Sequence, residues 1–183
     1  MSILQHIDYL LLVLDFGSQY THLITRRIRG LHVTSVCQPA GTSLKSIQAL
    51  KPAVVILSGG HSVQLDGAPT VPDRFFEYVK GKGVPVLGIC YGLHLIVKLL
   101  GGDVKPAERQ EYCRMQISAV EGSKLYGSLA GAVDNQTVWM SHGNEAVRLP
   151  EGFKVVATSV QGNIAAIENA EANIYALQYH PGV

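Results

Sequence analysis

Cysteine is scarce in this sequence, which has only Cys37, Cys90 and Cys113 among its 183 residues. The count is odd, and none of the three has the CxxC or metal-ligand spacing of a zinc site. We therefore expect neither a disulfide framework nor a bound metal. Unpaired thiols are kept most simply in a reducing compartment, so we predict a cytoplasmic protein.

The sequence also lacks an excess of charge of either sign. It has 15 Lys and Arg residues and 14 Asp and Glu residues, which gives a formal net charge of +1. Proteins that bind nucleic acids or anionic membranes usually carry a strong positive excess, so we expect neither partner. The basic segment TRRIRG at residues 25–30 places three arginines on one short helical stretch. Such a cluster is typical of a solvent-exposed face.

Long hydrophobic runs are missing as well. The apolar segment near the N-terminus is far shorter than a membrane-spanning helix, and it lacks the basic flank and small-residue cleavage site of a signal peptide. We interpret residues 10–15 as a buried first strand. Hydrophobic residues still make up 47% of the chain and charged residues 16%, which is enough for a substantial core.

In the first half of the chain, short apolar segments alternate with segments of helical length such as residues 20–29. The apolar segments are residues 10–14, 33–36, 54–57 and 84–89. This alternation predicts an α/β fold with an open, mostly parallel sheet flanked by helices. We find no repeat and no linker, so we expect a single domain over residues 1–183.

After Gly102 the pattern changes, because strand-like segments follow each other closely with Gly, Asn and Pro between them. They are residues 115–120, 137–140, 154–158, 164–167 and 174–178. Little room remains for helices between these segments. The C-terminal half is therefore predicted to add antiparallel or mixed strands to the sheet.

The segment VPVLGICYGLHLIVKLLGG at residues 84–102 predicts a strand, a GxCxG turn and a helix, with Cys90 at the turn. Gly88 and Gly92 permit a sharp turn and close helix packing. The helix N-terminus would lower the pKa of a thiol and stabilise an oxyanion. An isolated cysteine is also commonly a small buried hydrophobe, so this motif alone leaves both interpretations open.

A second segment favours chemistry at Cys90. Residues 174–183 read IYALQYHPGV, a strand followed by His180 and Pro181. The carboxyl ends of parallel strands meet at one edge of a sheet, where α/β proteins bind their ligands. Cys90 and His180 are therefore a candidate nucleophile and base, distant in sequence but close in the fold.

Two further segments are predicted to be loops at strand ends. The glycines of Ser58-Gly59-Gly60 would turn backbone N–H groups toward an anion, although a plain tight turn has the same sequence. The other segment is WMSHG at residues 139–143. Its His142 is a candidate ligand, a candidate base, or a turn histidine that is hydrogen-bonded to the backbone.

The motifs SGG, GICYG, WMSHG and QYHP occur in this order, and together they resemble the class I (triad) glutamine amidotransferases. The segments at residues 15–29 and 138–159 are most similar to the N-terminal glutaminase domain of GMP synthases. The resemblance covers residues 10–183, nearly the whole chain. It implies an amidotransferase fold with a flavodoxin-like core.

The resemblance implies glutamine as the substrate, with Cys90 attacking the side-chain amide and His180 moving the proton. The backbone N–H groups of Gly60 and Tyr91 would hold the oxyanion. The residues that it implies for seating the substrate are Gly59, His94, Ser141, His142 and Gly143.

The ammonia would be used by a synthetase that adenylates xanthosine monophosphate with ATP and Mg²⁺ and converts it to GMP. We expect no cofactor in the glutaminase domain itself. The sequence shows no phosphate-binding loop of a synthetase. We therefore expect this domain to work with an ATP-binding synthetase domain or subunit that the sequence does not contain.

The sequence departs from the family pattern at two functional positions. The family motif HPE carries the triad glutamate, but Gly182 stands there, and His94 replaces the usual substrate-binding glutamine. In serine triads, loss of the acid lowers kcat by about 10⁴-fold. Glu168 or Glu171 would replace that acid only if the fold brought it to His180. The alternative is an impaired pseudo-glutaminase that binds glutamine or a partner.

One smaller departure concerns Cys113, which stands where the family commonly has glycine. We expect this side chain to be packed rather than functional.

Overall fold

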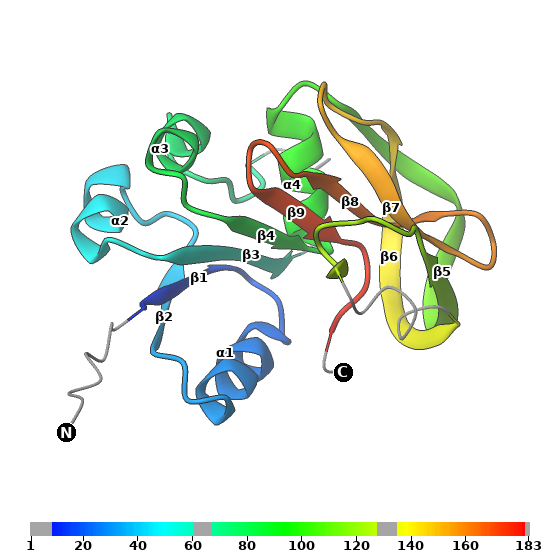
Figure 1. The fold of residues 1–183 in the computed structure, drawn as a ribbon, viewed down its shortest axis with the longest axis horizontal. Coiled ribbons are helices and arrows are strands. Elements are labelled where there is room, and N and C mark those ends of the chain that lie inside the picture. Colours follow the sequence, from blue (N-terminus) through cyan, green and yellow to red (C-terminus); the bar gives the residue numbers. More distant parts are fainter. Residues whose placement is uncertain (1–8, 61–66, 128–134, 182–183) are drawn as a thin grey trace.

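The computed structural model describes residues 9–60, 67–127 and 135–181. Within these ranges, nine strands form one sheet and four helices pack around the first part of it (Figure 1). The strands are β1 (Leu11–Phe16), β2 (Ser35–Pro39), β3 (Val54–Gly60), β4 (Val86–Ile89), β5 (Asp103–Ala119), β6 (Gln136–Arg148), β7 (Lys154–Ser159), β8 (Ile164–Asn169) and β9 (Ile174–Leu177). The helices are α1 (Thr21–Gly30), α2 (Leu44–Leu50), α3 (Phe75–Lys82) and α4 (Tyr91–Leu99). None of these helices is long and apolar enough to cross a membrane.

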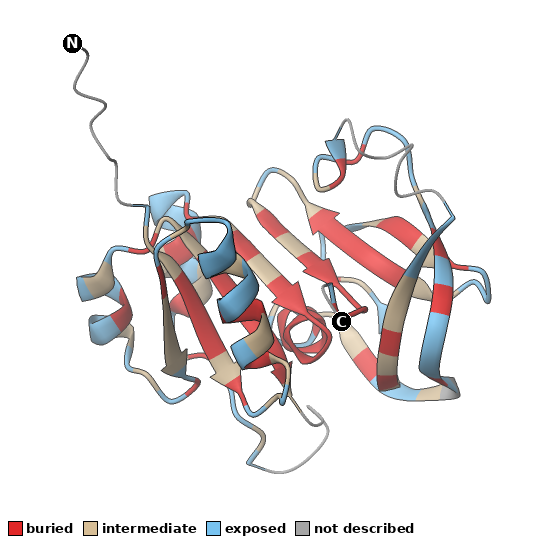
Figure 2. Cartoon of the chain, turned by 90° about the horizontal axis from the view of Figure 1, so that it is seen from below, coloured by how far each residue is buried: buried red, intermediate tan, exposed pale blue. Residues whose placement is uncertain are grey.

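The first part of the sheet is parallel, as the sequence predicts, with the order β2-β1-β3-β4-β9. Its central strands β1 and β3 are largely buried, whereas the edge strand β2 is mostly half-buried (Figure 2). Leu12 and Leu14 pack into the core that α2, α3 and α4 cover, whereas Val13 faces Ile24 of α1 on the other side. Successive side chains point to opposite faces of a strand, and this explains the unbroken apolar sequence of β1.

The carboxyl ends of β4 and β9 lie beside each other, because the two strands pair in parallel up to Ile89 and Leu177. Cys90 and His180 follow these two ends in the sequence. The topology therefore places the two candidate catalytic residues at the same edge of the sheet.

The second part of the sheet is antiparallel, with β9, β8, β7, β5 and β6 pairing in that order. Its long ribbon of β5 and β6 differs from the prediction, which placed strands only at residues 115–120 and 137–140. β5 begins at Asp103 and β6 continues to Arg148. The added parts contain polar residues and Pro106 instead of an apolar alternation, so their sequence does not identify them as strands.

The prediction that residues 58–60 and 139–143 form loops is wrong. Gly60 is the last residue of β3 and pairs with Phe16 of β1. His142 lies inside β6, directly opposite Glu111 of β5. The backbone groups of these turn-forming residues find partners in a neighbouring strand, and this pairing extends the strands.

Close packing of α4 on β3 requires a glycine in the first turn of the helix. A Cβ built on Gly92 would lie 3.0 Å from the backbone carbonyl carbon of Leu57. We expect Gly92→Ala to lower the free energy of unfolding by about 1–3 kcal/mol, as measured by urea unfolding.

Gly81→Ala is the matched control, because a Cβ at this position of α3 meets no atom within 4 Å. Replacing a glycine inside a helix is then expected to stabilise the protein by up to about 1 kcal/mol. Equal unfolding free energies for the two variants would contradict the packing argument.

Candidate active site

Cys90 sits on a strained turn between β4 and α4. Its backbone has φ 53° and ψ −99°, a conformation that side-chain-bearing residues rarely adopt. The backbone N–H of Cys90 donates to the Leu177 carbonyl of β9 over 2.7 Å. This bond fixes the turn to the neighbouring strand, and the arrangement is that of a nucleophile elbow.

The thiol of Cys90 contacts two residues from distant parts of the chain. Its Sγ donates to the Ser141 carbonyl oxygen at 3.6 Å, and Nε2 of Gln178 donates to the sulfur at 3.9 Å. Burial raises the pKa of Cys90 to about 11, and the backbone N–H of Tyr91 offsets only part of this rise. The prediction of a lowered thiol pKa is therefore wrong, because desolvation outweighs the helix N-terminus.

The burial of Cys90 predicts a low reactivity toward small alkylating agents. Cys113, for which we expected packing, is exposed on β5. We expect iodoacetamide at pH 8 to label Cys113 at least about tenfold faster than Cys90, because only the thiolate reacts. Below its pKa, Cys90 should label about tenfold faster for each unit of added pH. Peptide mapping by mass spectrometry measures both rates, and a Cys90 rate that levels off near neutral pH would contradict the raised pKa.

His180 follows β9 and is held by its backbone and its ring. Its N–H donates to the Trp139 carbonyl over 3.0 Å, and its ring centroid lies 4.7 Å from that of Tyr20. A Cβ built on Gly59 would lie 3.1 Å from Cε1 of His180. Gly59 therefore lets β3 approach the histidine closely.

The pKa of His180 is lowered to about 4, first by burial and then by the nearby His142. Its Nδ1 atom is buried and has no hydrogen-bond partner among the residues that the structure describes. In the described part of the chain, the sulfur of Cys90 forms hydrogen bonds with Ser141 and Gln178 and none with His180. At pH 7 the resting site thus contains a neutral thiol and a neutral imidazole.

The segment of β6 from Ser141 to Gly143 forms one wall of the site. The Ser141 carbonyl contacts the thiol, and a Cβ built on Gly143 would lie 3.0 Å from the Tyr112 hydroxyl oxygen. Both ring nitrogens of His142 are engaged, Nε2 with Glu111 Oε2 at 3.0 Å and Nδ1 with the Asn144 carbonyl at 2.9 Å. The expected hydrogen bond from His142 to the backbone is observed, although within β6 and not in a turn, and its roles as ligand or base stay predictions.

His94 lies one helical turn after Cys90 and is almost fully buried. Its Nε2 pairs with Oε1 of Gln178 at 2.8 Å, and the other end of the Gln178 amide reaches the Cys90 sulfur. Burial lowers the pKa of His94 to about 4, so the ring is neutral at pH 7. Gln178 was not among the predicted site residues, although a polar residue at the end of an apolar strand was a usable signal.

The model of the glutamine amidotransferase class-I family matches residues 12–183. The chain belongs to this family. Its curated relatives include proteins named GMP synthase (glutamine-hydrolyzing). The one from Macrococcus caseolyticus is 48% identical over 175 residues, and the one from Brachyspira hyodysenteriae is 44% identical over 173 residues. The alignments cover 95% and 94% of this chain but 33% and 32% of the relatives. The chain thus spans about a third of their length.

Solved structures give the same result for the fold. A GMP synthase subunit from Thermoplasma acidophilum has a TM-score of 0.79 at 28% identity, covering 97% of this chain and 86% of that one. A glutamine amidotransferase from Thermotoga maritima has a TM-score of 0.70 at 18% identity and covers 97% of this chain and 78% of that one. The predicted family and fold class are confirmed.

In the described part of the chain, neither candidate glutamate takes the place of the triad acid that the family resemblance implies. Glu168 accepts hydrogen bonds from Ser123 and from the backbone of Lys124 and Leu125, while Glu171 is exposed. Within the described residues, neither contacts His180, whose Nδ1 has no partner there. Gly182, at the position of the triad glutamate, lies outside the described residues.

Gly60 and Tyr91 of the amidotransferase lie against each other beside the elbow. A Cβ built on Gly60 would lie 2.9 Å from the Tyr91 ring and 2.9 Å from the Phe16 carbonyl oxygen. The Tyr91 hydroxyl donates to the Pro69 carbonyl, and its ring centroid lies 5.4 Å from that of Phe16. These contacts hold the ring of Tyr91, so its backbone N–H stays next to the Cys90 sulfur.

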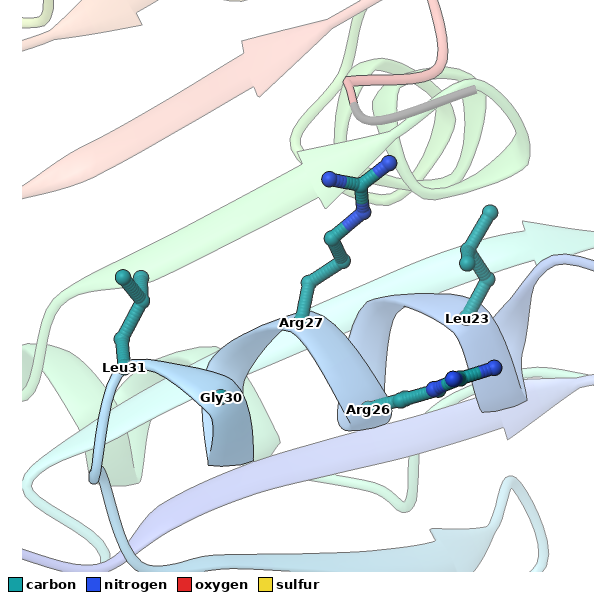
Figure 3. Close-up of a pocket in the computed structure, with 5 residues that line it drawn as sticks. All are labelled: Leu23, Arg26, Arg27, Gly30 and Leu31. Carbon is teal, nitrogen blue, oxygen red and sulfur yellow. The ribbon is translucent and has the colours of Figure 1, made fainter.

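The surface of the amidotransferase has hollows that differ in their relation to this site. One of about 690 Å³ lies on α1, where Arg26 and Arg27 project beside Leu23 and Leu31 (Figure 3). It is formed by α1 and the residue that follows it, and none of its lining residues belongs to the Cys90 turn. A hollow of about 490 Å³ is lined by Tyr20, Arg114, Thr137, Val138 and Trp139. Two of its residues, Tyr20 and Trp139, contact His180, so this hollow borders the site.

Proposed function

We propose that this chain hydrolyses glutamine to glutamate and ammonia through a thioester on Cys90. The observation that carries the proposal is the strained elbow that presents Cys90 where β4 ends, beside the strand that leads to His180. A thiol and an imidazole on neighbouring strand ends are the groups that acyl transfer needs. Membership of the amidotransferase family supports the same reaction.

In the proposed reaction, His180 accepts the proton of the Cys90 thiol as the sulfur bonds to the side-chain amide carbon of glutamine. The imidazolium then protonates the departing nitrogen, the C–N bond breaks and ammonia leaves. A water molecule gives a proton to His180 and attacks the thioester carbon. The C–S bond breaks, the sulfur regains the proton, and glutamate is released.

Backbone N–H groups of Gly60 and Tyr91 are proposed to stabilise the oxyanion of both tetrahedral intermediates. The substrate would be seated by Gly59, His94 and the segment of β6 from Ser141 to Gly143. The resting thiol donates a hydrogen bond to the Ser141 carbonyl. The substrate amide would have to break this hydrogen bond when it enters the site.

We further propose that the ammonia aminates xanthosine monophosphate to GMP in a synthetase domain or subunit that uses ATP and Mg²⁺. Support comes from the relatives, which are named GMP synthase (glutamine-hydrolyzing) and are about three times as long as this chain. We propose no cofactor for the glutaminase domain. All three cysteines are unpaired, which supports the proposed cytoplasmic location.

The test is glutamate release from glutamine by the purified chain, together with labelling by an electrophilic diazoketone analogue of glutamine. The analogue forms a thioether with the nucleophile as dinitrogen leaves, so mass spectrometry identifies the labelled residue. Turnover with a label on Cys90 supports the proposal. Absence of both signals overturns it, and labelling without turnover identifies an impaired glutaminase that still binds the substrate.

A further inference from the structure

Glu111 is a buried carboxylate outside the set of residues assigned to the reaction. It lies on β5, between β6 and β7 in the sheet, and only 1% of its surface is exposed. Its Oε2 atom pairs with Nε2 of His142 at 3.0 Å. Its Oε1 atom accepts from the Ser159 hydroxyl at 3.1 Å and from the Asn163 amide at 2.8 Å.

These bonds join three parts of the sheet at one point. His142 belongs to β6, Ser159 is the last residue of β7, and Asn163 lies in the turn that leads to β8. Burying a carboxylate costs free energy unless hydrogen-bond donors surround it. Loss of any of these hydrogen bonds is therefore unfavourable, and each partner is held in place. The carboxylate therefore anchors β6 to the turn between β7 and β8.

The anchored part of β6 is the part that contacts the thiol. The residue before His142 is Ser141, whose carbonyl accepts from Cys90 Sγ. The other ring nitrogen of His142 pairs with the Asn144 carbonyl, so the ring is fixed at both ends. The Glu111 anchor and the contact with the nucleophile are thus on adjacent residues of β6.

We infer that Glu111 is a positioning residue, which holds His142 and thereby keeps the Ser141 to Asn144 stretch of β6 in place against Cys90. The inference adds a positioning residue to the proposed function, and it rests on that function only for the measurements made with glutamine and its analogue. Glu111 does not touch the reacting atoms. Its role is to fix the backbone that covers the thiol and seats the substrate.

The test is Glu111→Gln, compared with Glu168→Gln in the same protein. Glu168 is the matched control, because it too is 1% exposed and accepts from several donors, which belong to residues 123–125 and Lys154. Both substitutions replace a buried carboxylate by an amide and leave the size of the side chain nearly unchanged. A loss of thermal stability is expected in both variants and does not distinguish them.

For Glu111→Gln we expect a more reactive thiol and, in the opposite direction, a weaker hold on the substrate. Iodoacetamide should alkylate Cys90 at least about threefold faster, because the Ser141 carbonyl no longer covers the thiol. Labelling by the diazoketone should be slower, and KM for glutamine should rise at least about fivefold with a smaller change in kcat, because the substrate seat is loosened. Glu168→Gln should leave both labelling rates, KM and kcat within about twofold of their values in the unmodified protein.

Equal alkylation rates in Glu111→Gln and Glu168→Gln would overturn the inference, since Glu111 would then be structural only. The alkylation rate needs no glutamine turnover, so it tests Glu111 even if the proposed function fails. If Glu111→Gln does not fold, the double variant Ser159→Ala and Asn163→Ala removes two donors from the same carboxylate. It should show the same pair of changes at about half the size, and unchanged rates would also overturn the inference.

Discussion

Replacing Cys90 by alanine is expected to lower the rate of glutamine hydrolysis by at least about 10³-fold, to the background rate. The reason is that the thioester cannot form without the sulfur. The remaining oxyanion donors would stabilise only a direct attack by water. Glutamate release in a coupled assay measures the loss, and the diazoketone should no longer label the protein at this position.

Two variants make this test specific. Cys113→Ala removes an exposed thiol on β5 that lies outside the proposed site, so its activity should equal that of the unmodified protein. Circular dichroism of Cys90→Ala should show an intact fold, because alanine removes only one sulfur atom from a small buried side chain. A rate that survives in Cys90→Ala would refute the thioester mechanism.

Replacing Gly182 by glutamate is expected to raise glutamine hydrolysis by at least about tenfold, with about 10⁴-fold as the upper bound that serine triads suggest. The buried Nδ1 of His180 has no hydrogen-bond partner in the described part of the structure. A carboxylate two residues later in the chain would accept from this nitrogen and orient the imidazole. The measurement is kcat for glutamate release.

The pH dependence provides a second readout for Gly182→Glu. His180 has a pKa of about 4 in the structure, mainly because burial disfavours its cation. A neighbouring carboxylate stabilises the imidazolium and raises this pKa, so the acidic limb of the rate profile should move to higher pH. Gly182→Gln is the control, because it adds a similar side chain without charge and should leave the limb unchanged. A glutamate variant no faster than the glutamine variant would show that the missing acid is not what restrains this site.

Local sequence patterns predicted the part of the fold in which the chain is apolar and regular. The parallel strands lie near the predicted segments, although β2 begins at Ser35 rather than at residue 33. The GICYG motif predicted the elbow at Cys90, because glycines on both sides of the cysteine allow a sharp turn. Motif order also gave the family, and the family model agrees.

The predictions failed where partners from distant strands decide the structure. His142 was expected in a loop, but backbone pairing with β5 places it inside β6. The thiol pKa was expected to fall, yet burial among β6 and β9 raises it. Glu111 belonged to none of the motifs, and Gln178 opens QYHP without being predicted as a site residue, so their contacts with His142 and Cys90 are what reveal them.

The sequence by itself determined the α/β architecture, the amidotransferase family and the residues that supply the proposed chemistry. The architecture depends on local periodicity, and the family depends on short motifs and their order, all of which can be followed along the chain without knowledge of the fold. The tertiary structure alone decided the protonation of the resting site, the covering of the thiol by Ser141 and the anchoring of that strand by Glu111. Desolvation and hydrogen bonding depend on which distant side chains surround an atom, and only the folded chain brings those side chains together.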